Sequence, residues 1–155
     1  MTRPVVAVIT DYLPPATRGG AMRALVAMLA ALGEEVKFHV ITRDHDALTG
    51  DPLHVAGAGR WVEEGALKVL RLSREALTVR SVVEAIATIR PDIIFANSLF
   101  SRLTQRVLWA RWRGQIRASP LVIAPEGELD DGALAIKPWR KRILLDLARR
   151  TGLVD

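Results

Sequence analysis

The segment from residue 5 to residue 33 constrains the fold of this chain more than any other. It begins with an unbroken apolar run, Val5–Ile9, which is typical of a strand buried on both faces of a parallel sheet. Pro14–Pro15 prevents the strand from continuing, because proline has no amide hydrogen to donate to a neighbouring strand. Residues 21–32 then predict a helix, preceded by two glycines and ended by a third.

The start of this helix is a candidate anion site. The first N–H groups of a helix lack partners within the helix, and phosphate binds readily to them at the carboxyl end of a strand. Gly19 and Gly20 would let the chain turn tightly before the helix. A tight turn without a ligand is an equally good interpretation. The loop has neither the G-x-G-x-x-G fingerprint nor the Gly-Lys-Ser/Thr of a P-loop.

Strands and helices alternate along the rest of the chain. The predicted strands are 35–42, 67–72, 92–96 and 121–124, with 61–63 as a hairpin partner or edge strand, and the predicted helices are 77–90, 101–112 and 138–150. Residues 43–59 form a polar connection that is too long for a routine connector, so it is mobile or a working loop. This order predicts a single domain over residues 1–155, a Rossmann-like, doubly wound parallel sheet of the α/β class.

Composition narrows the kind of site and the compartment. The chain has no cysteine, which excludes disulfides and thiolate metal sites and suits a reducing cytoplasm. Its three histidines lack metal-ligand spacing, so we expect no metal site. No secretion signal is visible, and the apolar run at 24–33 is too short to cross a bilayer. We therefore expect a cytoplasmic protein, with attachment to the inner face of the membrane as an alternative.

The net charge of +5 arises in the second half of the chain. Residues 101–119 contain arginines 102, 106, 111, 113 and 117 and no acidic residue. A second basic cluster consists of Lys137, Arg140, Lys141 and Arg142. This placement favours an anionic partner.

Trp109 lies on the basic face of the predicted helix 101–112. That face also carries Arg102, Arg106 and Arg113, whereas Leu103, Val107, Leu108 and Trp112 form the apolar side. Trp109 either stacks on a neighbouring guanidinium in solvent or anchors the helix among lipid head groups. The predicted helix 138–150 is built similarly, with Arg140 and Lys141 on its basic side.

Three loops follow buried strands at their carboxyl ends, over residues 10–20, 97–101 and 125–137. In doubly wound folds such loops converge on one crevice. The polar groups expected there are Asp11, Arg18, Gly19, Gly20, Asn97, Ser98, Glu126, Glu128 and Lys137.

Glu126 and Glu128 form a candidate acid/base pair, because residues two apart in an extended segment share a face. Alternatively, Glu128 neutralises Lys137 or caps a turn. The sequence offers no Gly-x-Ser-x-Gly motif and no Cys-His pair, so we assign no catalytic residue.

Four passages resemble the N-terminal domain of family 4 glycosyltransferases, which are retaining enzymes of GT-B architecture. They are TDYLPPATRGGAMRALVAMLAALGEEVKFHVIT, TRDHD, RPDIIFANSLFS and APEGELDDGALAIKPWRKRILLDLARRTGL, and together they cover nearly the whole chain. In the fourth passage, Gly-Glu-Leu, Ala-Leu and Lys-x-x-x-Lys occur in the order found in one branch of that family.

The resemblance implies the acceptor-side domain of a hexosyltransferase that builds a polysaccharide or a glycolipid. Gly19 and Gly20 would lie beside the donor diphosphate or the acceptor, and Asn97, Ser98, Glu126, Gly127 and Glu128 would shape the acceptor side. The acceptor would be a sugar or a lipid-linked sugar. The nucleotide-sugar donor would be held by a C-terminal domain or a separate subunit, so this chain itself would hold no cofactor.

The sequence departs from the family at two points. Members of the related branch have Arg, and others His, where this chain has Glu126, and a carboxylate there would repel phosphate. The Glu-x7-Glu pattern of the donor-binding domain does not occur. We therefore expect half of an enzyme, as a fragment, a truncated product or one subunit, that is inactive alone.

A binding module is the alternative from another functional class. Arg102, Arg106, Trp109, Arg113, Arg140 and Lys141 would face an anionic glycolipid or a membrane surface. We expect no nucleic-acid partner, because the arginine-rich helix lacks interleaved aromatic residues and any known reading motif.

Overall fold

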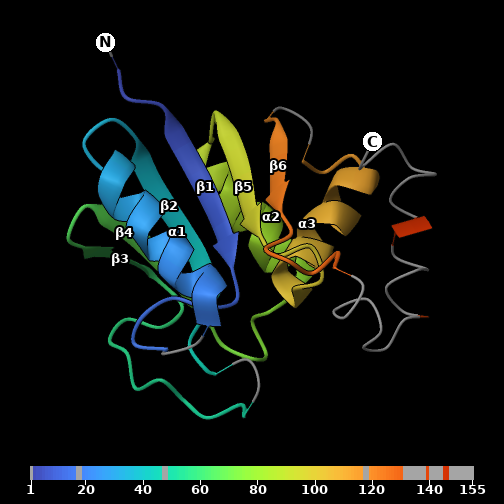
Figure 1. The fold of residues 1–155 in the computed structure, drawn as a ribbon, viewed down its shortest axis with the longest axis horizontal. Coiled ribbons are helices and arrows are strands. Elements are labelled where there is room, and N and C mark those ends of the chain that lie inside the picture. The colour runs from blue at the N-terminus through green and yellow to red at the C-terminus, as the bar shows by residue number, and fades with distance from the viewer. Residues whose placement is uncertain are drawn as a thin grey trace.

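A computed structural model describes residues 2–16, 19–46, 49–116, 119–130, 139 and 145–146. These residues form one six-stranded sheet and three helices (Figure 1). The strands are β1 Val5–Thr10, β2 Lys37–Arg43, β3 Trp61–Glu64, β4 Leu67–Leu72, β5 Ile93–Asn97 and β6 Leu121–Ala124, and the helices are α1 Gly19–Leu32, α2 Val79–Ile89 and α3 Arg102–Trp112.

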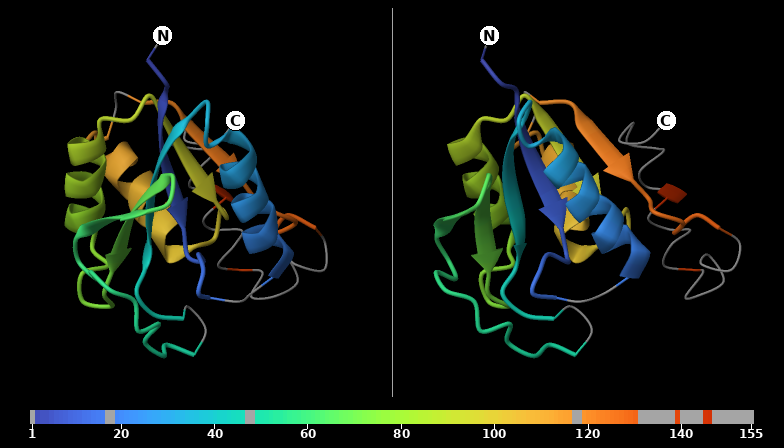
Figure 2. Two further views of the ribbon diagram at one scale, coloured as in Figure 1. Left: turned by 90° about the vertical axis from the view of Figure 1, so that its left-hand side faces the viewer. Right: turned by 60° about the vertical axis from the view of Figure 1, so that its left-hand side comes forward.

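The sheet is mostly parallel, in the order β3-β4-β2-β1-β5-β6. Only the hairpin β3–β4 is antiparallel. Helix α1 covers one face, and α2 and α3 cover the other, so that the sheet is the middle of three layers (Figures 1 and 2). The predicted α/β fold class is confirmed.

Two hydrophobic clusters hold these layers together. On the α1 face, Val8, Val40 and Val69 from adjacent strands pack with Leu25 and Leu29 of the helix. On the opposite face the cluster contains Ile9, Ile41, Ile94, Val82, Leu103 and Val107. Neighbouring residues of β1 thus point to opposite cores, which explains why this strand is apolar without interruption.

Local signals set the ends of the helices. The Ser101 side chain accepts a hydrogen bond from the Thr104 amide at 3.0 Å and caps α3, as the sequence predicts. Thr78 caps α2 in the same way, through the Ser81 amide at 3.1 Å. Helix α2 ends where Arg90 adopts a left-handed conformation, directly before a proline.

The structure corrects one detail of the helix pattern. The sequence places Trp112 on the apolar side of α3, but its side chain is 51% exposed. Trp112 is the last residue of the helix, and its ring lies against Trp109, with centroids 4.9 Å apart, instead of against the sheet. The predicted helix 138–150, including Arg140 and Lys141, lies outside the described residues except for residues 139, 145 and 146.

The stability of the fold should depend strongly on Leu103, which is fully buried where α3 meets the sheet. We expect Leu103→Ala to lower the free energy of unfolding by about 2–5 kcal/mol, because it removes apolar contacts and leaves a cavity. Urea denaturation measures this change. Leu32→Ala is the matched control: Leu32 is 39% exposed, and a loss of comparable size there would contradict the assignment of the core.

Candidate functional site

The carboxyl ends of five parallel strands lie at one edge of the sheet, the lower edge in Figure 1. From β1 the chain passes along α1 to β2, whereas β5, on the other side of β1, is reached through α2 on the opposite face. The winding of the sheet therefore reverses between β1 and β5. Ligands of doubly wound sheets bind in the crevice at this switch point.

Asn97 lies at the switch point, at the end of β5 and opposite Thr10 of β1. Its side chain is 5% exposed, and its Oδ1 atom has no hydrogen-bond partner among the described residues. Thr10 is satisfied by contrast, because its hydroxyl donates to the carbonyl of Tyr12 and accepts from its amide. A buried polar atom without a partner is costly, so Asn97 is available to a ligand.

Glu128 connects the loop after β6 to the loop after β5. Its carboxylate accepts hydrogen bonds from the Ser98 hydroxyl at 2.6 Å, the Leu99 amide at 2.6 Å and the Phe100 amide at 3.3 Å. Ser98 has a φ of 102°, a conformation that costs free energy for a residue other than glycine. The capping interpretation of Glu128 agrees with these bonds, and Lys137 lies outside the described residues.

The expectation that Glu126 and Glu128 share one face of an extended segment is wrong. Strand β6 ends at Ala124, and the chain turns, with φ values of 50° at Glu126 and 79° at Gly127. The Glu128 amide donates to the Pro125 carbonyl at 2.9 Å and closes this turn. Glu126 is exposed, and its side chain makes no hydrogen bond among the described residues.

The two glycines lie at the start of α1, as the sequence predicts, since the helix begins at Gly19. A Cβ atom at Gly20 would meet nothing within 4 Å. The glycine is thus not required by close packing within the described residues, and the space beside it is open to a ligand. Arg18 lies outside the described residues.

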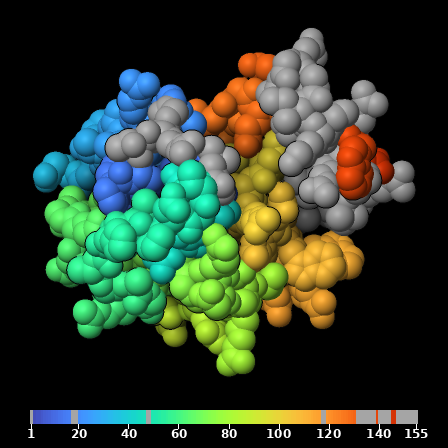
Figure 3. Space-filling model, turned by 90° about the horizontal axis from the view of Figure 1, so that it is seen from below, coloured from blue at the N-terminus to red at the C-terminus, as the bar shows by residue number. Residues whose placement is uncertain are grey.

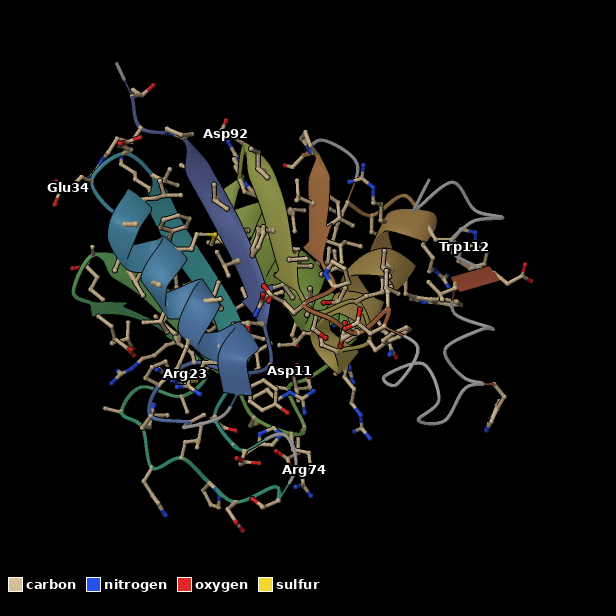
Figure 4. All side chains as sticks on the ribbon, in the orientation of Figure 1. Asp11, Arg23, Glu34, Arg74, Asp92 and Trp112 are labelled. Atoms are coloured by element: carbon tan, nitrogen blue, oxygen red, sulfur yellow. The ribbon has the colours of Figure 1, made fainter. Side chains whose placement is uncertain are left out.

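A cavity of about 480 Å³ opens at the same edge. Six of its described lining residues are acidic or arginine, namely Asp11, Arg43, Asp46, Arg74, Arg102 and Arg106. We call it the arginine cavity. Figure 3 views this edge, where the teal segment after β2 lies close to the lime-green residues before α2. Asp11 and Arg74 lie at this edge in Figure 4, whereas Glu34 and Asp92 lie at the opposite one.

The charges around the arginine cavity are only partly balanced. Arg43 and Asp11 form a buried ion pair, with Nε–Oδ1 and Nη2–Oδ2 distances of 3.0 and 2.8 Å. Burial, followed by the charges of Arg43 and Arg102, lowers the pKa of Arg106 from its ordinary value, while Asp11 acts in the opposite direction. Arg106 stays protonated, because a guanidinium is charged at any physiological pH. Its charge is therefore retained in an unfavourable environment.

The predicted basic face of α3 divides into two parts. Arg102 and Arg106 line the arginine cavity. Farther along the helix, Trp109 is 43% exposed, and Arg113 lies over its ring with Cζ 5.9 Å from the centroid. This contact agrees with the interpretation in which Trp109 stacks on a guanidinium. The exposed ring pair of Trp109 and Trp112 also presents an apolar surface beside Arg113.

Arg43 and Arg74 are site residues that the sequence pattern did not indicate. Arg43 ends β2, and Arg74 follows β4, so both reach the edge from strands that the loop-based prediction did not include. The signal was the long segment 43–59, which borders this cavity with its first residues. In the described part of the chain, no group of three or more His, Asp or Glu side chains is arranged to hold a metal ion.

Comparisons with known proteins add no family to this geometry. No family model matches the sequence, and neither a curated protein nor a solved structure matches it significantly. Among the described helices, none combines the length and the apolar character that a membrane span requires.

The bonds of Glu128 can be tested by a pair of substitutions in one turn. We expect Glu128→Gln to lower the free energy of unfolding by about 1–3 kcal/mol, because at least one of its three donors loses a charged acceptor. Glu126→Gln makes the same chemical change two residues away and should have little effect. Equal effects in chemical denaturation would show that the carboxylate of Glu128 does not hold the two loops together.

Proposed function

We propose that this chain is the acceptor-side domain of a retaining hexosyltransferase. In this function a second domain holds a nucleotide-sugar, and this chain presents a sugar or lipid-linked sugar acceptor to it. The product is a polysaccharide or a glycolipid. The chain alone transfers no sugar.

One observation carries the proposal: the buried Oδ1 atom of Asn97, which lies at the switch point of a doubly wound sheet and has no hydrogen-bond partner among the described residues. A side-chain amide both donates and accepts hydrogen bonds, which suits the hydroxyl groups of a sugar. Ser98 and Glu128 support it by holding the adjacent loop in one conformation. The open space beside Gly20 leaves room for the ligand to approach the start of α1.

The sequence resemblance supports the identity of the reaction. The passage RPDIIFANSLFS, which carries the likeness to family 4 glycosyltransferases, contains Asn97 and Ser98. In the proposed reaction this domain acts by positioning the acceptor, and the leaving diphosphate is stabilised by the donor-binding domain. We assign no catalytic base and no cofactor to this chain.

Asn97 can be tested without knowledge of the acceptor. Saturation-transfer NMR with a panel of disaccharides (maltose, lactose and cellobiose) should show binding to the chain, and Asn97→Ala should weaken it roughly two- to tenfold. The substitution should have little effect on stability, because the Oδ1 atom of Asn97 has no hydrogen bond to lose among the described residues. Gln115→Ala is the control, since this exposed amide lines a different cavity together with Asp92.

Two results would contradict the proposed function. One is turnover of UDP-glucose, UDP-galactose or GDP-mannose into a glycoside by the chain alone. The other is binding of the nucleotides without any binding of sugars, which would make this domain the donor side.

A second function, contact with an anionic membrane surface, is favoured by the exposed indole pair on α3. Trp109 and Trp112 are 43% and 51% exposed and lie beside Arg113, which combines an apolar body with a positive charge. Exposed Trp residues and cations of this kind bind at the head-group layer of a bilayer. The contact would place an acceptor domain at the inner face of the membrane. The same contact would also allow a stand-alone module to bind an anionic glycolipid.

Vesicle flotation tests whether the chain binds an anionic membrane through Trp109 and Trp112. We expect the chain to float with phosphatidylglycerol-containing vesicles, to float less at high salt and not to float with phosphatidylcholine alone. The double substitution of Trp109 and Trp112 by Ala should abolish flotation, because it removes the apolar anchor. Leu129→Ala, at a 44% exposed apolar residue outside α3, should leave it unchanged. Flotation independent of the two tryptophans would contradict the proposed contact.

A further inference from the structure

We propose that the arginine cavity binds the phosphate group of a small phosphate monoester, a molecule of the size of a sugar phosphate. The inference starts from the charges that line the cavity. Arg43 is neutralised by Asp11 at 2.8 Å. The other acidic and arginine residues described in the lining are Arg74, Arg102, Arg106 and one carboxylate, Asp46, so the lining has an excess of two positive charges. Glu75 interacts electrostatically with Arg74 but does not belong to the lining.

The fold does not explain the charges of Arg102 and Arg106. Arg102 begins α3, where a positive charge opposes the helix dipole, and the first turn of α3 contains no acidic residue. The only hydrogen bond of the Arg106 side chain in the described structure goes to the Arg102 carbonyl, on the same helix, at 2.8 Å. Burial and two neighbouring guanidinium groups meanwhile lower the pKa of Arg106. An anion in the cavity would relieve this repulsion.

The charge and size of the cavity favour a phosphate monoester over other anions. A phosphate monoester carries about −1.5 to −2 charges at neutral pH, which balances an excess of two, whereas a carboxylate carries one. Guanidinium groups bind phosphate oxygens in pairs, with two parallel hydrogen bonds. The volume of about 480 Å³ lies in the range of small-molecule pockets and leaves room for the organic part beside Tyr12 and Phe100.

Gly50 makes room for one of these arginines at the cavity wall. It has a φ of 80°, and a Cβ atom at this position would collide with the Nη2 atom of Arg74. Arg74 donates a hydrogen bond to the Gly50 carbonyl at 3.4 Å. Gly50→Ala thus displaces a guanidinium of the cavity without changing the charge of the protein.

The binding of phosphate does not depend on the transferase function proposed above. Only its interpretation as the anionic group of an acceptor rests on that function. A binding measurement without donor or turnover therefore tests the cavity alone, and its failure leaves the role of Asn97 untouched.

The experiment is calorimetric titration of the full chain with glucose 6-phosphate, with glucose as the neutral control and inorganic phosphate as the minimal anion. We expect glucose 6-phosphate to bind more tightly than glucose, and inorganic phosphate to compete with it. Arg102→Gln and Arg106→Gln should each weaken binding about tenfold or more, since each removes hydrogen bonds to a charged group. Arg113→Gln makes the same charge change directly after the same helix, outside the cavity, and should alter the affinity less than twofold.

Thermal unfolding shows whether a variant that binds less phosphate is still folded. Arg106→Gln should unfold at the same temperature as the wild-type chain or a higher one, because the substitution removes a repelled charge. Gly50→Ala should weaken phosphate binding while Gly59→Ala, at a glycine with the same φ of 80° and open space around it, should not. Phosphatidic acid vesicles distinguish a lipid head group from a free ester: if the vesicles do not compete with glucose 6-phosphate, the cavity is assigned to the soluble molecule.

Three results would overturn the proposal. They are equal binding of glucose and glucose 6-phosphate, equal loss of affinity in Arg113→Gln and Arg106→Gln, and no heat with either phosphate compound at millimolar concentration. The second result would assign the anion to the general charge of α3 instead of to the cavity.

Discussion

Strand β1 is the element on which the rest of this structure depends. It forms hydrogen bonds with β2 on one side and β5 on the other, and its two faces belong to two separate hydrophobic clusters. A strand with partners on all four sides cannot shift by one residue, because its side chains would then enter the wrong core. The ends of β1 and β5 are therefore fixed side by side, which places the crevice between them.

The carboxyl edge of the sheet combines two environments of different polarity. Around Asn97 the groups are neutral or tied up, since Glu128 uses its carboxylate on Ser98 and the amides that follow. Around Arg106 the charges are in excess. One edge can thus offer hydrogen bonds to an uncharged ligand and attraction to a charged one.

The parts of this molecule that sequence analysis predicted are those whose causes are local. The apolar run of β1, the proline that follows α2 and the Ser101 cap act within a few residues of themselves, so their pattern is visible in one dimension. The Arg43–Asp11 pair spans 32 residues, and the bond from Ser98 to Glu128 spans 30. Such pairs depend on which strands become neighbours. The turn at Glu126 was missed for a different reason: a left-handed conformation at a glutamate has no compositional signal.

The long sequence separation between Glu128 and its hydrogen-bond donors affects how the N-terminal end of α3 can form. The amides of Leu99 and Phe100 find their acceptor only when the loop after β6 is in place, although both belong to the loop after β5. Their protection from hydrogen exchange should therefore report the docking of the last described strand, not the formation of the helix that they precede. The start of α3 would then be the last part of the site to become ordered during folding, and the first to open when the edge strand detaches.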